Sequence, residues 1–405
     1  MPSSLITALR PNPPADVDVS ASLGEDDQHN LLHALAAIPD PRDPRGVQYR
    51  LTSLLAVAVC AVLAGAATFA AIADWAADLD PPARHRLGFA GPIPVGSTVW
   101  RLLVRLDAQV LQAVLTGWLR SRISSPPAGS RQRSGRVVIA IDGKVLRGAR
   151  LPDGRRVHLL SAYDTATGVV LAQLRIATKS NEIPAFAPLL DQAQAMLGSL
   201  AGVVIVADAL HAQVGHAHDV TARGAHLMVT VKANQPTLLQ QLHTLPWAQV
   251  SVGHRTHDRG HGRRETRTLK AVTVDTPGGL GFPYASQAVR ITRTRTVASK
   301  TTRETAYLIV TLPAEQAQPD QLYDWARREW HIENRLHWIR DVTFGEDAHQ
   351  ARTGNGPAVA AVLRNTAIGY HRTNGETNIA RATRHADRRP HDLIHAVISN
   401  NPTTQ

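Results

Sequence analysis

The 405-residue sequence is short of cysteine and of aromatic side chains. Its one cysteine, Cys60, excludes a disulfide framework and any zinc site built from several thiolates of one chain. A free thiol is typical of reducing compartments, and the first residues lack the basic and apolar run of a secretory leader, so we expect a cytoplasmic protein. Hydrophobic residues still make up 43% of the chain, which is enough for a sizeable core in roughly two to four domains.

Long apolar runs are also rare. One uncharged stretch, residues 54–73, reaches the length that a membrane helix needs. Alanine dominates this stretch, alanine contributes little to membrane insertion, and the chain has no second run of this kind. We therefore expect a buried helix here and no membrane association.

Lysine is the third shortage, because only five of the 44 basic residues are lysine. The 33 acidic residues leave a net charge of +11, which is unevenly distributed. Residues 1–100 hold 6 basic and 10 acidic side chains, a net of −4, so the remainder carries +15. A basic body favours a polyanionic partner, of which nucleic acid is the commonest, and the alternative is an arginine-rich coding bias.

Apolar spacing and turn residues divide the chain into segments. Within 135–236, apolar strands and helical patterns follow in the order β-β-β-α-β-α-β, which is typical of an α/β domain. The pattern of 51–78 predicts one long helix, ended by Pro81 and Pro82. The predicted divisions are a flexible tail at 1–25, a helical N-terminal domain at 26–120, a linker at 121–134, the α/β domain at 135–236, a β-rich insertion at 237–318, the rest of the α/β domain with C-terminal helices at 319–390, and a C-terminal tail at 391–405.

Two carboxylates occupy similar places in this pattern. Asp142 and Asp208 each end an apolar strand, and each precedes a small residue. Carboxylates at adjacent strand ends repel one another, so bringing them together favours a bound cation. Oxygen ligands select hard ions such as Mg²⁺ or Mn²⁺. The alternative for each aspartate is a loop-capping role.

A third acid is expected on a later helix packed against these strands. Glu333 flanks the apolar stripe of a helix that starts at Gln321, and Arg340 lies seven residues on, two turns along the same side. A glutamate on a helix surface is often only a solvated charge, so Glu346 and Asp347 are the alternative acids.

Ten motifs follow one another along the chain. They are IPDPRDPRG at 38–46, LLAVAVCAVLAGAATFAAIADW at 54–75, AIDGKVLRGAR at 140–150, VHLLSAYD at 157–164, KSNEIP at 179–184, VADALHAQ at 206–213, VKANQP at 231–236, HGRRETR at 261–267, WHIENRLHWIRDVTFGED at 330–347 and LRNTAIG at 363–369. With these motifs in this order, the chain resembles the DDE transposases of bacterial insertion sequences. The specific resemblance is to the ISAs-type family, also known as H-repeat-associated proteins, and it covers nearly the whole chain beyond residue 28.

The resemblance implies a ribonuclease H-like catalytic domain, a mixed five-stranded sheet with helices, which carries the β-rich insertion and follows an all-helical N-terminal domain used for DNA binding or assembly. It implies Asp142, Asp208 and Glu333 as the catalytic residues and as the ligands of two Mg²⁺ or Mn²⁺ ions. The implied reaction is cleavage at the ends of the element and strand transfer into target DNA. The implied partners are the terminal inverted repeats, the target DNA and a second copy of the chain, in a bacterial protein at the nucleoid.

Two positions depart from the family pattern. Glu329 stands where relatives commonly carry arginine or histidine, four residues before Glu333, and Ala233 stands where they commonly carry glycine.

Several side chains are candidate DNA contacts, with solvated surface charges as the alternative. Three lysines lie just after strand ends, two arginines belong to the HGRRETR motif, and two further residues share the helix of Glu333. The candidates are Lys144, Lys179, Lys232, Arg263, Arg267, His337 and Arg340. Trp325, Trp330 and Trp338 could stack on a displaced base, but their helical spacing favours the core.

Two other functions fit the same residues. A catalytically inactive or domesticated DNA-binding relic would keep the basic body without the acidic triad, and the presence of all three acids argues against it. A metal-dependent nuclease that cuts DNA without strand transfer would use the same triad, so the sequence leaves that alternative open.

Overall fold

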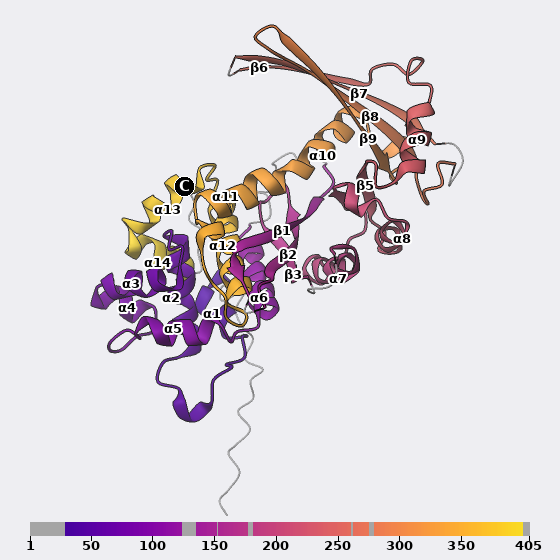
Figure 1. Ribbon diagram of the computed structural model, residues 1–405. Helices are drawn as coiled ribbons and strands as arrows, with labels where there is room; N and C mark the ends of the chain where they lie inside the picture. Colours follow the sequence, from indigo (N-terminus) through magenta and orange to yellow (C-terminus); the bar gives the residue numbers. More distant parts are fainter. Residues whose placement is uncertain are drawn as a thin grey trace, which may run out of the picture.

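The computed structural model describes residues 29–123, 135–151, 153–176, 181–260, 262–274 and 279–399. The described chain is a mixed α/β structure built on one nine-stranded sheet, as Figure 1 shows, which confirms the predicted fold class at this level. The predicted tail at 1–25 and most of the predicted linker at 121–134 lie outside the described residues.

The sheet has the strand order β3-β2-β1-β4-β5-β9-β8-β7-β6. Its strands are β1 (Val138–Arg150), β2 (Arg156–Asp164), β3 (Val170–Arg175), β4 (Val204–Ala207), β5 (His226–Val231), β6 (His254–Gly260), β7 (Arg263–Thr273), β8 (Gln287–Val297) and β9 (Lys300–Val310). The neighbours β1, β4 and β5 run parallel, and every other pairing is antiparallel.

The β-rich insertion predicted at 237–318 is joined to the central sheet. Strand β9 pairs with β5 from Met228↔Val310 to Val231↔Tyr307, so the four later strands extend the central sheet. An unpaired edge at β5 would expose a row of backbone N–H and C=O groups, and β9 satisfies them. The sheet therefore has nine strands rather than five.

Two apolar layers enclose the centre of the sheet, because side chains alternate between the faces of a strand. Val138 and Ala140 belong to the first layer, which continues into the N-terminal and C-terminal helices. Ile139 and Ile141 belong to the second layer. The helices that cover the second face are α7 (Phe186–Leu197), α8 (Val214–Ala222) and α9 (Pro236–Thr244).

The N-terminal helices pack against the C-terminal ones instead of forming a domain of their own (Figure 1). The N-terminal helices are α1 (Leu31–Leu35), α2 (Leu51–Leu63), α3 (Phe69–Asp78), α4 (Pro81–Arg86), α5 (Gly96–Leu103) and α6 (Ala108–Ser121), and the C-terminal ones are α12 (Gly356–Thr373), α13 (Ile379–Asp387) and α14 (Pro390–Ile398). Arg122 Nη2 donates to the carbonyl of Ala396 at 2.9 Å, which joins the two groups directly. The expected C-terminal tail from residue 391 is thus in large part helix α14, whose Ile394 and Val397 are buried.

The helix predicted over 51–78 is two helices. The first, α2, is almost wholly buried, as expected of its alanine-rich sequence, and it ends before Gly65. Gly65 has φ +103°, a conformation that favours glycine, and a Cβ there would lie 3.3 Å from the Cβ of Thr383. In the described residues no single helix is long and apolar enough to cross a membrane; α5 and α6 reach that length only together, across a bend of 98°.

A π turn interrupts the helix predicted to run through Arg340. Helix α10 (Pro319–Ile332) continues into a π-helical segment, Glu333–His337, and then into α11 (Trp338–Val342). A π turn closes its hydrogen bonds one residue later than an α-helix, so side chains beyond it are displaced around the axis by about one residue. Arg340 consequently points inward instead of sharing a face with Glu333.

Arg340 is completely buried in an ion cluster that fixes this helix to the sheet and to α12. Its Nε donates to Glu346 at 2.8 Å, and Arg364 donates to the other oxygen of the same carboxylate at 2.8 Å. Gln173 of β3 and Asn365 of α12 accept further bonds from Arg340. Burial acts to raise the pKa of Glu346, but the two guanidiniums outweigh it and hold that pKa below its ordinary range.

The substitution Glu346→Gln tests this cluster. It leaves two buried guanidiniums without their shared anion, and we expect the free energy of unfolding at pH 7 to fall by about 3–5 kcal/mol. Because the folded-state pKa of Glu346 is lowered, the carboxylate stabilises the protein above the ordinary glutamate pKa, and this contribution is lost as the pH falls through the lowered value. Urea unfolding at pH 7 and in acid should show a deficit that narrows as the pH falls. The exposed Glu315→Gln is the control, and an equal deficit in both variants would contradict the role of the cluster.

Candidate active site

Strands β1 and β4 bring the two predicted aspartates to matching positions on one face of the sheet. Asp208 follows the end of β4 as predicted, whereas Asp142 lies within β1, which continues to Arg150 along β2. The strands pair in parallel register up to Ile141 and Ala207, so Asp142 and Asp208 occupy matching positions one residue further on. The alternate residues before them lie in the first apolar layer, so both aspartates belong to the face that α10 crosses. Asp208 also caps its loop, since one carboxylate oxygen accepts from the backbone N–H of Leu210 at 2.9 Å. That bond uses one of its two oxygens.

The π turn after α10 places two side chains against Asp142. Glu333 is its first residue and His337 its last. His337 Nδ1 lies 3.3 Å from Glu333 Oε2 and 3.4 Å from Asp142 Oδ2. One ligand atom from each of the three residues lies within 4.8 Å of the others, which is close enough for one metal ion to contact all three. Rare π turns occur frequently at functional sites, and this one sets the spacing of the cluster.

His337 was predicted to contact DNA, but its ring is only 2% exposed. Its Nε2 atom is buried without a hydrogen-bond partner among the described residues. The hydrogen bond from His337 lowers the pKa of Glu333, helped by the charge of Lys144 and opposed by partial burial. His337 therefore lies within the acidic centre, with its Nδ1 close to both carboxylates.

Glu329 is the acidic residue that the sequence prediction left out of the site. It lies one helical turn before Glu333 and close to both aspartates, and its carboxyl group is hydrogen-bonded with Thr230 of β5. Burial, Asp208 and Asp142 raise the pKa of Glu329 to about 7, and Lys232 opposes them in part. Its four-residue spacing from Glu333, which places both on one helix face, was the signal available in the sequence.

The predicted lysines divide between structural and exposed positions. Lys144 is buried, and its Nζ lies 2.6 Å from Asp341 Oδ2, so it ties β1 to α11 and is not available to a phosphate. Lys232, which follows β5, is exposed beside Glu329. Lys179 lies outside the described residues. Arg340, buried in its ion cluster, is corrected from a DNA contact to a structural residue.

The two arginines of the HGRRETR motif that were predicted to contact DNA lie far along the sheet on β7. Arg263 is exposed. Arg267 is ion-paired with Asp258, at 3.3 Å, and with Glu265, so its charge is already balanced within the sheet.

A second network lies on the other face of β1, where Gly143 leaves room for it. The Glu182 carboxylate meets His158 Nε2 of β2 at 3.0 Å and His211 Nε2 at 3.3 Å. A Cβ at Gly143 would overlap the Glu182 carboxylate, which explains the small residue after Asp142. Burial acts to raise the pKa of Glu182, but the bonds with the two histidines outweigh it and lower that pKa to about 2. The network joins the loop after Asp208 to the strand of Asp142.

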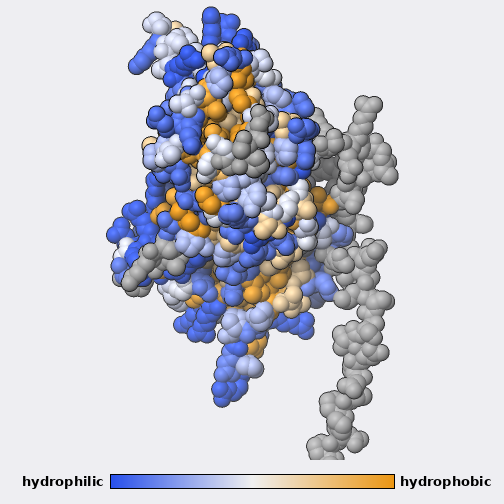
Figure 2. All heavy atoms as spheres, turned by 90° about the vertical axis from the view of Figure 1, so that its right-hand side faces the viewer, coloured by the Kyte–Doolittle hydropathy of each residue, from blue (hydrophilic) through white to orange (hydrophobic). Residues whose placement is uncertain are grey.

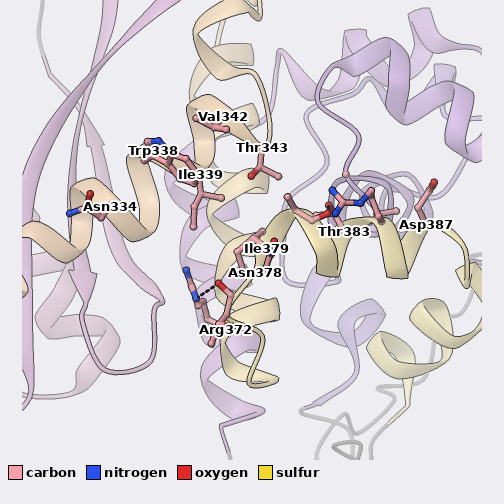
Figure 3. Close-up of a pocket in the computed structure, with 15 residues that line it drawn as sticks. Asn334, Trp338, Ile339, Val342, Thr343, Arg372, Asn378, Ile379, Thr383 and Asp387 are labelled. Atoms are coloured by element: carbon pink, nitrogen blue, oxygen red, sulfur yellow. Dashed lines mark hydrogen bonds between the residues drawn. The ribbon is translucent and has the colours of Figure 1, made fainter. Parts of the chain in front are cut away.

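A pocket of about 760 Å³ opens beside the π turn. Figure 3 shows Asn334, Trp338 and Ile339 on one side of it and Ile379 and Thr383 of α13 on the other. Of the three tryptophans expected in the core, Trp325 is buried, at 4% exposure, whereas Trp330 is 63% and Trp338 56% exposed. Two of the three thus remain accessible on the helix of Glu333.

The donor set of the site fits a hard divalent cation. It offers carboxylate oxygens, which suit hard divalent ions, and one imidazole, which suits transition metal ions. Clustered carboxylates without a cation are electrostatically unfavourable, and Asp208 and Asp142 add to the effect of burial in raising the pKa of Glu329.

Two family models match the chain. Residues 133–369 match the model described as "Transposase DDE domain", and residues 32–119 match the model described as "DDE_Tnp_1-associated". The first covers the sheet and the acidic centre, and the second covers the N-terminal helices.

Relatives named as transposases are similar over most of their length. A protein named "Putative transposase YncI" from Escherichia coli O157:H7 is 27% identical over 84% of this chain and 86% of its own. The protein "H repeat-associated putative transposase YhhI" from Escherichia coli strain K12 is 26% identical over 84% of this chain and 89% of its own.

Among solved structures, the piggyBac transposase synaptic complex with hairpin DNA matches 94% of this chain and 80% of that chain at a TM-score of 0.41 and 11% identity. That score is below the level from which a shared fold follows. The family rests instead on the DDE domain model, which spans more than half of the sequence, and on the full-length relatives. The chain belongs to the DDE transposases, enzymes that cleave DNA and transfer the cleaved strand, and membership implies dependence on a divalent metal ion.

Proposed function

We propose that Asp142, Asp208 and Glu333 form the catalytic triad and hold two Mg²⁺ or Mn²⁺ ions. The observation that carries the proposal is the parallel register of β1 and β4, which sets the two aspartates side by side, together with the π turn that sets Glu333 against Asp142. Two such ions, if held by these carboxylates, would supply positive charge for the attacking and leaving oxygens of an in-line displacement at phosphorus.

The residues around the triad supply position and charge. His337 holds Glu333 and Asp142 in one arrangement, and the Glu182 network holds the two strand ends behind them. Lys232 is exposed beside the acids and can contact a phosphate of the bound strand. No side chain has to act as a nucleophile. Water attacks the phosphorus at the element's end and breaks its bond to the 3′-oxygen, which leaves a 3′-hydroxyl on the element and a 5′-phosphate on the flanking DNA. That 3′-hydroxyl then attacks a phosphodiester of the target DNA and displaces a 3′-hydroxyl of the target.

The proposed scaffold of this centre is a ribonuclease H-like sheet. Its support is the order β3-β2-β1-β4-β5, with β2 antiparallel to β1 and with the aspartates on the neighbouring strands β1 and β4. Helix α10 packs against β1 and β4 and supplies the third acid, as such a scaffold requires.

The proposed partners are DNA ends bearing the terminal inverted repeats, target DNA and a second copy of the chain, at the bacterial nucleoid. A reaction that joins two ends to one target needs two active centres, which supports a homodimer on paired ends. The net charge of +11 supports binding to DNA. The N-terminal helices are proposed for assembly or end recognition.

The triad is tested by reaction on DNA that carries the native ends, in Mg²⁺ or Mn²⁺. We expect Asp208→Asn to lower end cleavage and strand joining more than about 100-fold, because loss of a metal ligand exceeds the loss seen for residues that only support ligands. Asp347→Asn, a matched change at the alternative acid, should keep wild-type activity. Full activity in Asp208→Asn would reject the triad, and cleavage without joining in the wild type would assign the nuclease reaction instead.

Metal binding can be measured without activity. Mn²⁺ added to the metal-free protein should raise its thermal midpoint, because a ligand at 100 times its Kd contributes about 2.7 kcal/mol to stability. In Asp142→Asn the increase should disappear, whereas the exposed Glu376→Gln should keep it. An undiminished increase in Asp142→Asn would place the ion elsewhere.

Glu329 gives the metal-free protein a pH dependence. Its pKa is raised from 4.5 to about 7, so the folded protein holds this proton more tightly than the unfolded chain does. The free energy of unfolding should therefore fall as the pH rises from about 4.5 to about 7, by on the order of 1–3 kcal/mol. In EDTA, Glu329→Gln should flatten this slope, as followed by urea unfolding from pH 5 to pH 8. Parallel curves for the two proteins would contradict the assignment.

A further inference from the structure

The outer halves of β6, β7, β8 and β9 extend beyond the helices that cover the sheet (Figure 1). We call this part the arm and define it as residues 255–260, 263–268, 292–297 and 300–305. Hydrophilic atoms dominate the top of the molecule in Figure 2, at the height where these strands end in Figure 1. The arm has no apolar core of its own, so its side chains are free to serve a surface function.

The register of the four strands assigns every arm residue to a face. Pairing is continuous from Gly260↔Arg263 to His254↔Leu269, and from Arg263↔Val297 to Thr273↔Gln287, without a shift. Paired residues of an antiparallel sheet share a face, and Leu269 lies in the first apolar layer. Every second residue of β7 counted from Leu269, together with the residues paired with them on the other strands, therefore forms the face that α10 covers. On this face the hydroxyl of Tyr323 in α10 lies 2.8 Å from the hydroxyl of Thr256.

All three acidic residues of the four strands lie on that α10-side face. They are Asp258, Glu265 and Glu304. Glu265 is buried between Arg267 and Arg293, and Arg293 also reaches Glu304 at 3.4 Å. The acids of the α10-side face are thus paired with Arg267 and Arg293. The other three cations of this face, Arg263, Arg295 and Lys300, form no ion pair with a described residue.

The opposite face of the arm carries arginine and threonine and no carboxylate. We call it the Arg/Thr face. Its members are Arg255, His257, Arg259, Arg264, Thr266, Thr268, Thr292, Thr294, Thr296, Thr301, Arg303 and Thr305. The four arginines are exposed, and none of them forms an ion pair with a described residue.

Folding alone gives no reason for this distribution. Arg259 stands directly opposite Arg264, and like charges in a cross-strand pair are destabilising. Closer to the centre of the sheet, the cations of the same face have partners. Lys270 donates to the carbonyl of Trp247 at 2.7 Å, and Arg290 lies over the Trp247 ring. Beyond Trp247, the cations of the Arg/Thr face meet only solvent and hydroxyl groups.

We propose that the Arg/Thr face binds the phosphate backbone of duplex DNA. Guanidinium groups and threonine hydroxyls are the side chains that contact phosphate oxygens, and the absence of carboxylates removes all repulsion from this face. It carries no Trp, Tyr or Phe on which an unpaired base would stack, so it suits a backbone instead of single-stranded bases. The strip is about 20 Å long, six residues at roughly 3.3 Å each, and so faces about half a turn of duplex.

The bound duplex is not the segment being cleaved. Strand β8 is the fourth strand from β1, so at the usual spacing of 4.8 Å the two strands are about 19 Å apart. The arm projects further away from the acidic centre. The face contacts DNA flanking the reactive phosphodiester or a second duplex. This proposal rests on the proposed function only in taking DNA as the substrate.

Paired double variants of the full-length protein test the face directly. Arg264→Ala with Arg303→Ala removes two exposed cations from the Arg/Thr face, and Arg295→Ala with Lys300→Ala removes two cations from the α10-side face. Binding to a fluorescent 30-base-pair duplex without element ends is followed by anisotropy in EDTA at several salt concentrations. We expect the first variant to bind at least about 10-fold more weakly at low salt, with a slope of log affinity against log salt reduced by about 1.8. The second should bind within about threefold of wild type with its slope unchanged.

Each other outcome overturns the proposal. Equal losses in both variants would mean that net charge alone sets affinity, and wild-type binding by both would mean that the arm does not meet DNA. Stronger competition by duplex RNA than by duplex DNA would identify a different partner. Far-UV circular dichroism checks that both variants are folded. Because the assay contains no metal, Asp208→Asn should still bind in it, so failure of the triad and failure of the arm are distinguished.

Discussion

The parallel pairing of β1 with β4 is the contact on which the functional part of this molecule depends. It fixes two aspartates at matching positions on one face, where their charges repel unless a cation lies between them. The surrounding structure is arranged to hold that unfavourable pair. Gly143 gives the Glu182 carboxylate room behind Asp142, and His211 ties the loop after Asp208 to the same carboxylate. Burial, together with the charges of Asp208 and Asp142, raises the pKa of Glu329 beside this pair.

The helix that completes the site is held by charges of a different kind. Arg340, Glu346 and Arg364 form a buried cluster with no role at the metal, and it fastens the segment after the π turn to β3 and α12. Removing one member of such a cluster leaves an uncompensated buried charge. Any shift of the helix that separates these side chains is therefore strongly unfavourable. A site built from a π turn needs this restraint, because an α-helical alternative would rotate Glu333 and His337 relative to each other.

The long sheet separates two uses of charge along one set of strands. Near β1 and β4 the exposed surface is acidic and suits a metal ion, whereas the arm presents a face of arginine and threonine without acids. Strand alternation makes this possible within a few residues, since Arg263 and Arg264 belong to opposite faces. One element can therefore place all its acids on the side of α10 and leave the other side with arginines alone.

The sequence by itself determined the mixed α/β class, the central strands, the buried alanine-rich helix and the family, because alternation, strand-end acids and ordered motifs are local signals. It also singled out Asp142, Asp208 and Glu333, whose catalytic role is still a proposal. Only the tertiary structure decided the rest. The π turn turns Arg340 into the core, and such a turn has no periodic signature in a sequence. The partner that occupies Lys144 is Asp341, which is 197 residues away along the chain. The nine-stranded sheet, the helix at 390–398 and the joining of N- and C-terminal helices all arise from contacts between distant segments. Such contacts are set by which unsatisfied edges and apolar faces meet, and no local pattern records them.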